Sequence, residues 1–430
     1  MAERVVLILP KTSYRADAFL AAARATGVDL LVASDRCHVL DGEYEFPPNS
    51  FVVDLGDPAA AAERIVVAAR ERPVRAVIPA GGETAALVAA LAAERLGLAY
   101  NPSAAAEAAR NKRRMRELLD GAGVPQPHWL TCAIDDDPAA LAARVEEALG
   151  WPCVLKPLLL SGSRGVMRAD NAPGFVALFA RLRRLLLTPE LLAMDDVASR
   201  QVLVESFVPG AEVALEGLLE QGQLRVLALF DKPDPLDGPF FEETLYVTPS
   251  RLPAATQATI AAVTRTAARA MGLSEGPVHA ELRLPHDCCV GSEVPVVIEV
   301  AARSIGGLCG RMLRFGTGMS LEELLIRHAI GADVSQLARE QSAAGAMMLP
   351  IPAAGVLKAV DGVDAARAVP GIDDVVISTP IGAELVPLPE GSSYLGFLFA
   401  RAATPDAVET ALRAAHAALR FTLASTLPTT

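Results

Sequence analysis

Apolar strand patterns and amphipathic helix patterns alternate along the first 100 residues, and this alternation restricts the possible fold more than any other feature. Short apolar runs predict buried strands, and apolar residues at helical spacing predict the helices between them. Repeated strand–helix units favour a parallel, doubly wound sheet. Ligands bind beyond the carboxyl ends of the strands in such sheets, so the turn at 79–83, with Gly81 and Gly82, is a candidate ligand edge. The expected elements are strands at Val5–Pro10, Asp29–Ser34 and Ala76–Pro79 and helices at Ala16–Thr26 and Glu83–Leu96.

Length and charge restrict the class of protein. A chain of 430 residues is long enough for about two to four compact domains. Its content of 52% hydrophobic and 21% charged residues is typical of a packed globular protein. The net charge of −12 argues against binding to nucleic acid or to an anionic membrane. The densest basic cluster, at 112–116, is followed by Glu117 and Asp120, which is typical of a solvated helix face.

No targeting or membrane segment is expected. The N-terminal sequence MAERVVLILPK has an apolar run that is too short for a signal peptide. Other apolar stretches are interrupted well before the roughly 20 residues that a bilayer span requires. The six cysteines form no CxxC motif, so reduced thiols are the default expectation. The sequence therefore predicts a cytoplasmic protein.

After the first domain, the pattern changes from parallel units to shorter strands. A boundary is expected near residues 101–103, followed by a helix-rich stretch and a small α+β unit that ends at about 205. Alternating strands from 206 to 330 favour a largely antiparallel sheet. Ser320 and Glu323 form a capping box for a helix that ends near Ile330. The expected strands are Trp129–Ala133, Cys153–Pro157, Gln201–Glu205, Glu212–Leu219, Leu224–Asp231, Pro277–Leu284, Pro295–Val300, Gly355–Val360, Val375–Ser378 and Leu395–Arg401.

A lysine followed by a glycine-rich turn is the first candidate for binding chemistry. Lys156 is near the end of a predicted buried strand, and residues 161–166 (SGSRGV) follow it. A fixed cation beside free backbone N–H groups suits a phosphate. The lysine precedes the glycines, unlike in a Walker A loop, and no GxGxxG motif occurs here. An ordinary hairpin with a mobile turn explains the same pattern equally well.

The segment VLVESFVPGAE, at 202–212, is the second candidate. It predicts a strand that enters a Pro-Gly turn, with Glu205 and Glu212 on either side. A strand end with free backbone groups beside two acceptors suits an adenine edge and a ribose diol. Surface carboxylates around a turn are the alternative interpretation.

Two acidic residues on neighbouring predicted strands are the third candidate. Glu281 belongs to one strand and Glu299 to the next. If the strands pair as a hairpin, the two carboxylates face each other about 5 Å apart and repel unless a cation joins them. Such oxygen ligands suit Mg²⁺ or Mn²⁺. One of the two pointing into solvent is the alternative.

Arg303 is the fourth candidate, because it lies just beyond Glu299 and precedes Gly306 and Gly307. An arginine fork beside a glycine turn suits a carboxylate or an acyl phosphate. An arginine that caps a loop is the alternative.

The order and spacing of these four patterns resemble the ATP-grasp superfamily over most of the chain. The resemblance implies ATP bound between a lid subdomain and a metal-binding sheet. It divides the chain into an N-terminal parallel α/β domain (1–105), linker helices with the lid subdomain (106–205), a catalytic antiparallel sheet (206–335) and a closing subdomain (336–430). It implies phosphate binding by Lys112 and Lys156, a lid loop with Ser161, Gly162, Ser163 and Gly165, adenine contacts at Glu205, Ser206 and Val208, a ribose acceptor at Glu212, and metal ligands at Glu281 and Glu299.

Within this superfamily, the motif E-x-A-A-R at 299–303 resembles the bacilysin-type dipeptide ligases, in which the arginine faces the acyl phosphate. Many relatives have an asparagine where this chain has Ala301, so the second cation would be held more by water or phosphate. The segment FFEETLYVTP resembles a family stretch with a histidine in place of Tyr246. Tyr246 or Lys232 would then contact the transferring phosphoryl group.

The resemblance implies an ATP-dependent carboxylate–amine ligase that joins amino acids or similar small molecules, with ATP and two Mg²⁺ or Mn²⁺ ions as cofactors. It also makes a homodimer possible. A carboxylase or purine-pathway-type ligase that activates bicarbonate or formate is the alternative enzyme. A nucleotide-binding scaffold without turnover is the alternative from another class, and Ala301 is its best support.

Overall fold

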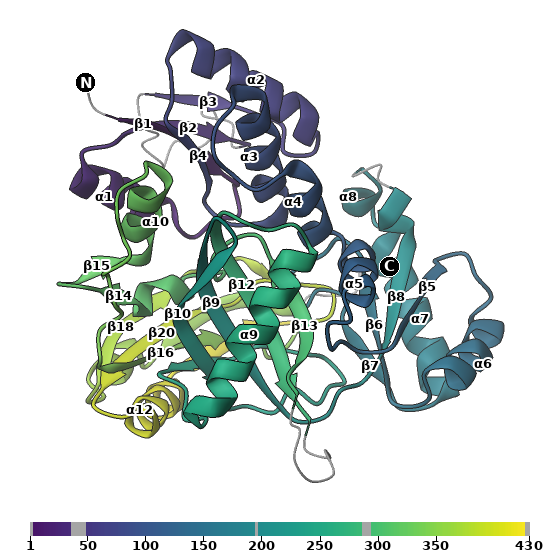
Figure 1. The fold of residues 1–430 in the computed structure, drawn as a ribbon. Helices are drawn as coiled ribbons and strands as arrows, with labels where there is room; N and C mark the ends of the chain where they lie inside the picture. The colour runs from purple at the N-terminus through teal and green to yellow at the C-terminus, as the bar shows by residue number, and fades with distance from the viewer. Residues whose placement is uncertain (1–2, 36–48, 194–196, 286–293, 426–430) are drawn as a thin grey trace.

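The N-terminal part of the molecule is a parallel sheet covered by helices on both faces. The computed structural model describes residues 3–35, 49–193, 197–285 and 294–425. The strand order is β3-β2-β1-β4, and side chains of β1 alternate between the faces, with Val5 and Leu7 toward α1 and Val6 and Ile8 toward α2 and α3 (Figure 1). This confirms the predicted doubly wound sheet. The elements are β1 (Arg4–Leu9), α1 (Ala16–Thr26), β2 (Asp29–Ser34), β3 (Ser50–Val52), α2 (Pro58–Glu71), β4 (Ala76–Pro79) and α3 (Glu83–Leu96).

Two short helices lead from this domain to the lid subdomain, an antiparallel sheet in the order β5-β8-β6-β7. Helices α6 and α7 pack on the sheet through Leu141, Phe175 and Phe179. Figure 1 shows this subdomain at the right, beside the central sheet. The elements are α4 (Ser103–Arg110), α5 (Lys112–Gly121), β5 (Trp129–Ala133), α6 (Pro138–Ala148), β6 (Cys153–Pro157), β7 (Met167–Ala169), α7 (Ala172–Leu186), α8 (Pro189–Leu192), the 3₁₀ turn η1 (Val197–Arg200) and β8 (Gln201–Ser206).

The centre of the molecule is an antiparallel sheet that, over the described residues, has eight strands in the order β13-β12-β9-β10-β11-β16-β20-β18. Helix α9 covers one face of β9, β12 and β13, where Ile260 packs against Val278 and Leu282. Ser320 accepts a hydrogen bond from the Glu323 N–H, which is the N-cap half of the predicted capping box, whereas the Glu323 carboxylate binds Arg327. The elements are β9 (Ala211–Glu220), β10 (Gln223–Lys232), β11 (Leu245–Thr248), α9 (Ala254–Ala270), β12 (Gly276–Leu284), β13 (Val296–Ala301), the 3₁₀ turn η2 (Cys309–Met312), β14 (Arg314–Phe315), β15 (Met319–Ser320) and α10 (Leu321–Ala329).

The C-terminal segment differs from the expected closing subdomain. Instead of only covering the catalytic sheet, it extends that sheet, because β16 pairs with β11 and is followed by β20 and β18. A separate small sheet in the order β19-β17-β21 completes the segment. The elements are β16 (Ala343–Leu349), β17 (Gly355–Asp361), α11 (Val363–Arg367), β18 (Ile372–Ile377), β19 (Glu384–Leu385), β20 (Gly396–Ala402), α12 (Pro405–Ala418) and β21 (Arg420–Ala424).

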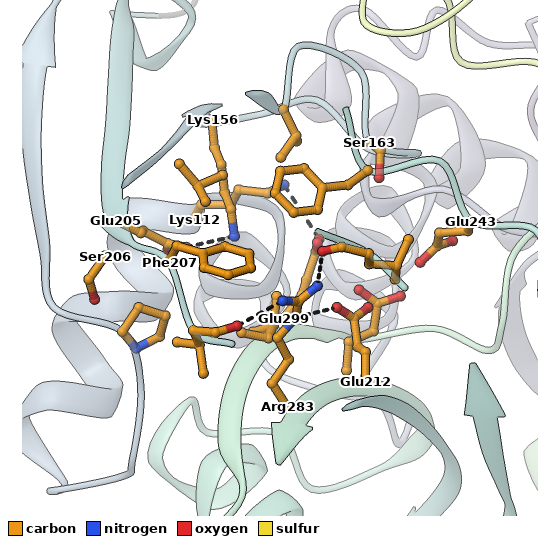
Figure 2. A pocket seen from close by; sticks show the side chains of 18 of the residues that line it. Lys112, Lys156, Ser163, Glu205, Ser206, Phe207, Glu212, Glu243, Arg283 and Glu299 are labelled. Atoms are coloured by element: carbon orange, nitrogen blue, oxygen red, sulfur yellow. Dashed lines mark hydrogen bonds and ion pairs between the residues drawn. The ribbon is translucent and has the colours of Figure 1, made fainter. Parts of the chain in front are cut away.

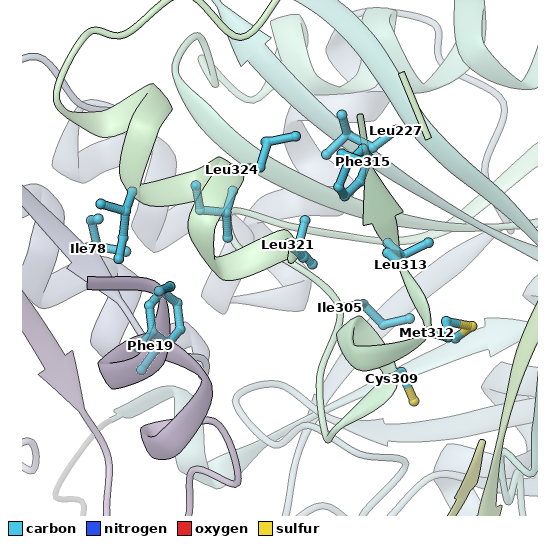
Figure 3. Packing of buried hydrophobic residues seen from close by; sticks show 14 of the residues in the cluster. Phe19, Ile78, Leu227, Ile305, Cys309, Met312, Leu313, Phe315, Leu321 and Leu324 are labelled. Atoms are coloured by element: carbon cyan, nitrogen blue, oxygen red, sulfur yellow. The ribbon is translucent and has the colours of Figure 1, made fainter. Parts of the chain in front are cut away.

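A shared hydrophobic cluster joins the N-terminal domain to the central sheet through α10. Figure 3 shows Phe19 and Ile78 on one side, Leu321 and Leu324 of α10 between, and Leu227 of β10 beyond them. The two domains are therefore packed on one continuous core. None of the described helices has the length and apolar character needed to cross a membrane. Of the cysteines, Cys132, Cys153 and Cys309 are buried free thiols, and Cys37, Cys288 and Cys289 lie outside the described residues.

Candidate active site

A pocket lies between the lid sheet and the β12–β13 edge of the central sheet. It brings together ten of the predicted site residues, from five separate parts of the sequence. In Figure 2, Lys112 and Lys156 lie on the lid side of the pocket, and Glu212 and Glu243 lie on the opposite side. The predicted residues that line it are Lys112, Lys156, Ser161, Ser163, Glu205, Ser206, Val208, Glu212, Glu281 and Glu299.

Lys156 is fixed by an ion pair across two strands of the lid. Its Nζ lies 2.6 Å from Glu205 Oε2, and Arg116 Nε of α5 lies 2.6 Å from Glu205 Oε1. Burial opposes ionisation of Glu205, but the charges of Arg116 and Lys156 outweigh it and lower its pKa to about 2. The Glu205 carboxylate is therefore a negative anchor for two cations.

Lys112 joins the lid to the acidic edge of the central sheet. It is the first residue of α5, and Asn111 caps this helix by accepting from the Arg114 N–H. Its Nζ donates to the Leu160 carbonyl at 2.7 Å and lies 3.4 Å from Glu299 Oε1. The two predicted phosphate-binding amines thus lie in one pocket, each beside a carboxylate.

Backbone groups of the strand end at 205–208 already have hydrogen-bond partners, whereas the sequence pattern predicts that they are free. The Ser206 N–H donates to the His128 carbonyl at 2.9 Å, and the Val208 carbonyl accepts from Arg283 Nη1 at 2.7 Å. Gly210 is required in the turn that follows, because its φ is +113° and a Cβ there would lie 1.9 Å from the Leu284 carbonyl oxygen. The chain therefore turns tightly against the end of β12.

The lid loop is held by the C-terminal segment, a contact that the sequence does not reveal. The Gly165 N–H donates to the Pro389 carbonyl at 2.8 Å, and Arg164 Nε donates to the Glu390 carbonyl at 2.8 Å. Arg181 of α7 binds the Glu390 carboxylate through Nε and Nη2 at 2.6 and 2.8 Å. Ser161 and Ser163 face the pocket, whereas Gly162 and Gly165, both with positive φ, shape the turn without lining it.

Glu281 and Glu299 are directly opposite each other on β12 and β13, which confirms the predicted hairpin pairing. The closest group of acidic oxygens is different, however. Glu212, Glu243 and Glu281 each place one carboxylate oxygen within 4.8 Å of the others. The sequence does not single out Glu243 as a metal ligand, because it lies in the irregular segment between β10 and β11. The pocket thus has Glu299 beside Lys112 and a denser acidic group farther along its wall.

Lys232 is the cation at the centre of that acidic group. Its Nζ lies 2.7 Å from Glu212 Oε1 and 2.9 Å from Glu281 Oε1, and it also contacts Glu243. Burial favours a neutral amine, but these carboxylates outweigh it and raise the pKa of Lys232 well above its usual value. Burial and the Glu281 charge raise the pKa of Glu243. Tyr246 lies behind this group, with its hydroxyl 3.5 Å from Glu281 Oε1.

The predicted ribose acceptor Glu212 has both oxygens engaged. Lys232 contacts Oε1, and Arg283 Nε donates to Oε2 at 2.8 Å. Arg283 also lies over the ring of Phe207, with 5.1 Å between the guanidinium carbon and the ring centroid. Sequence reasoning missed Arg283, although its position two residues after Glu281 on β12 places both side chains on the same face of the sheet.

Arg303 lies outside the pocket lining and pairs with the N-terminal domain. Its Nε and Nη2 donate to Glu83 Oε1 at 2.8 and 2.5 Å. Glu83 opens α3, directly after Gly81 and Gly82 in the predicted ligand edge. Burial opposes ionisation of Glu83, but the Arg303 charge outweighs it and lowers the pKa. The candidate ligand edge of the parallel sheet therefore meets the E-x-A-A-R motif.

Replacing Arg116 by methionine is expected to destabilise the fold by about 3–5 kcal/mol, because the buried Glu205 carboxylate keeps Lys156 but loses the fully buried guanidinium. Arg116 is fully buried and also donates to the carbonyls of Val297 and Ile298. Chemical denaturation measures the change, and Arg113→Met on the exposed face of α5 is the control, with an expected change below about 0.5 kcal/mol. The Glu205 contribution is present above pH 4.5 and is lost as pH falls toward its folded pKa of about 2. Equal stabilities of the two variants would contradict this role.

Comparisons with known proteins agree with this architecture. Residues 149–312 match the model of an ATP-grasp domain, and residues 347–424 match L-amino acid ligase C-terminal domain 2. The chain is 29% identical to the uncharacterized protein y4rH of Sinorhizobium fredii over 318 residues, which are 71% of this chain and 59% of that protein. It is 27% identical to the alanine–anticapsin ligase of Bacillus subtilis over 253 residues, which are 55% of this chain and 50% of that enzyme. The chain thus spans between half and three fifths of the length of these relatives.

A solved structure shares nearly the whole fold. The L-amino acid ligase from Bacillus licheniformis superposes with a TM-score of 0.81 over 98% of this chain and 99% of that one, at 24% identity. The two chains therefore share one fold. Residues 149–312 are therefore an ATP-grasp domain and residues 347–424 an L-amino acid ligase C-terminal domain 2, on a fold shared with that solved structure.

Proposed function

We propose that this protein is an ATP-dependent carboxylate–amine ligase that joins two amino acids or similar molecules and forms ADP and phosphate. The observation that carries the proposal is the pocket in which two lysines, Lys112 and Lys156, face two paired acidic residues, Glu281 and Glu299. The match to the C-terminal domain of L-amino acid ligases favours amino acids as substrates.

Lys112 and Lys156 are well placed to bind the nucleotide phosphates. Lys156 is held by Glu205 at the lid side, and Lys112 lies between the Leu160 carbonyl and Glu299. Fixed amines at these positions offset the charge of a transferring phosphoryl group, and electrostatics with positioning is the main resource of phosphoryl transfer. The lid loop, held by Pro389 and Glu390, keeps water from the reacting groups.

The acidic donors suit Mg²⁺ or Mn²⁺, because both are hard cations that bind carboxylate oxygens and substrate phosphates. Glu281 and Glu299 would hold such ions, and Ala301, on the same strand as Glu299, offers no side-chain oxygen. A bound divalent cation supplies charge neutralisation between the outer phosphates. We propose two ions, as the resemblance implies, and Glu243 would be a further oxygen donor where an ion replaces its contact with Lys232.

A free carboxylate is a poor acyl donor, and phosphorylation by ATP would convert it into a reactive acyl phosphate. A substrate carboxylate oxygen attacks the γ-phosphorus of ATP, the bond to the β–γ bridging oxygen breaks, and ADP leaves. The amine then attacks the acyl carbon, loses a proton and expels phosphate. Arg303 would hold the acyl phosphate, for which its guanidinium must exchange its present partner Glu83. Lys232 and Tyr246, behind the acidic group, would support the phosphoryl side.

The proposal extends to the setting of the reaction. Both substrates are small molecules, and we propose that the reaction takes place in the cytoplasm. A homodimer is the proposed assembly, by analogy with ligases of this kind. The molecular mass in solution, from light scattering, tests the last point.

A panel of amino-acid pairs tests the function. The protein is incubated with ATP, Mg²⁺ and each pair, and ADP, phosphate and the amide product are measured together. The expected result is one equivalent of each with at least one pair. ADP release that depends on bicarbonate alone would favour a carboxylase, and tight Mg-ATP binding with no ADP over the whole panel would favour a protein without turnover. Either outcome contradicts the proposal.

A further inference from the structure

Glu216 is a fully buried carboxylate within the central sheet, and the proposed reaction does not use it directly. It lies on β9 opposite His279 of β12. Its Oε2 is 3.1 Å from His279 Nδ1 and accepts from the Ile305 N–H at 2.9 Å. Its Oε1 is buried and has no hydrogen-bond partner among the described residues. A buried carboxylate with an unpaired oxygen costs stability, so Glu216 is expected to have a role beyond packing.

The first connection leads from Glu216 to the acidic wall of the pocket. His279 and Glu281 are two residues apart on β12, so their side chains are on the same face of the sheet. The His279 ring has Nδ1 beside Glu216, and its Nε2 lies 3.7 Å from Glu281 Oε1. His279 is buried, with 6% of its surface exposed. Glu216 therefore sets the orientation of the ring that flanks Glu281.

The second connection leads to the arginine segment after β13. Ile305, whose N–H donates to Glu216, is two residues after Arg303. Its side chain is packed in the cluster of Figure 3, beside Leu313 and Met312. The backbone of this segment is thus fixed from one side by apolar packing and from the other by the Glu216 carboxylate. The same carboxylate thus contacts the ring beside Glu281 and the backbone two residues after Arg303.

We propose that Glu216 is a positioning residue that holds Glu281 through His279 and the Arg303 segment through the Ile305 N–H. This inference rests on the proposed function, because it takes Glu281 as a metal ligand. Partners that orient a ligating side chain raise metal affinity by about 10–100-fold. If one carboxylate orients both Glu281 and the Arg303 segment, the metal site and the acyl-phosphate site stay at a fixed separation. A reaction with two steps in one site requires such a fixed geometry.

The test is the affinity for Mn²⁺ in the presence of ADP, measured by electron paramagnetic resonance on the full-length protein. Glu216→Gln keeps the size of the side chain and an oxygen for the Ile305 N–H but removes the charge beside His279. The expected result is a rise in the Mn²⁺ dissociation constant of about 10–100-fold. His279→Gln is expected to give a similar rise, and the double variant is expected to be no worse than either alone, since both act along one connection. Glu220→Gln, exposed at the end of the same strand, is the control with unchanged affinity.

Glu281→Gln separates failure of this inference from failure of the proposed function. If Glu281→Gln leaves Mn²⁺ binding unchanged, the metal assignment itself is wrong. If it weakens binding while Glu216→Gln and His279→Gln both stay within about twofold of the wild type, only the positioning role is overturned. Should Glu216→Gln fail to fold, His279→Gln with the same threshold decides the result.

Discussion

Replacing Lys156 by alanine is expected to lower the rate of amide formation by about 10²–10³-fold, the loss typical of removing one fixed donor from a developing charge. Lys156 projects from the lid sheet into the pocket, and Glu205 fixes its amine. Arg116 stays in place to neutralise Glu205, so the fold is expected to survive the substitution. Steady-state measurement of ADP release with the best substrate pair gives kcat and the KM for ATP.

Lys358→Ala is the matched control, because Lys358 is an exposed lysine on β17, in the separate C-terminal sheet. Its turnover is expected to equal that of the wild type. If the Lys156→Ala protein has the thermal stability and the turnover of the control, Lys156 does not bind the transferring phosphate.

Glu281→Gln and Glu299→Gln are expected to lower kcat by about 10²–10⁴-fold, since loss of a metal ligand removes several kcal/mol of charge stabilisation. The two residues are opposite each other on β12 and β13, and each lines the pocket. Glutamine retains one oxygen, so a partial recovery at high Mg²⁺ is expected. The measurement is ADP release as a function of Mg²⁺ concentration at saturating ATP.

The Mg²⁺ dependence separates a metal role from general damage. A damaged protein loses turnover at every Mg²⁺ concentration, whereas a weakened metal site shifts the midpoint upward. Glu220→Gln, on the exposed end of β9, is expected to keep the wild-type midpoint. Wild-type midpoints in both Glu281→Gln and Glu299→Gln would place the divalent cation elsewhere.

The local elements were largely predictable, because strand and helix periods are properties of short windows. The helices Ala16–Thr26 and Glu83–Leu96 end at Gly27 and Gly97, both in the left-handed conformation that the glycine signal predicts. Strand β16 was missed, because AAGAMML contains residues of low strand propensity and its burial comes from neighbours on both sides in the sheet. The end of the expected strand at Val375 was correct within one residue, but the strand begins earlier, at Ile372.

The candidate site was predictable where its residues carry a fixed order along the chain. Lys112, Lys156, Glu281 and Glu299 all line the pocket. The residues that form ion pairs with the site residues were not predictable, because an ion pair between domains joins residues at no regular spacing in the sequence. Arg303 and Glu83, for example, are 220 residues apart.

The contact of the lid with Glu390 has the same explanation. Arg181 pairs with a residue 209 positions away in the C-terminal segment, and only the packing of the two subdomains reveals it. The roles of Glu243 and Arg283 likewise depend on the position of Lys232 and Glu212 in space. Prediction from sequence therefore reached residues that line the pocket and stopped at the residues that pair with them.

Transfer of an oxygen isotope tests the central claim most directly. The carboxylate substrate is labelled with ¹⁸O in both carboxyl oxygens, and the phosphate released with ADP is analysed by mass spectrometry. Formation and aminolysis of an acyl phosphate moves one labelled oxygen from the carboxylate to the phosphate, so the account predicts one ¹⁸O in each phosphate and one in the amide product. Unlabelled phosphate beside ADP, or label in AMP, would contradict it.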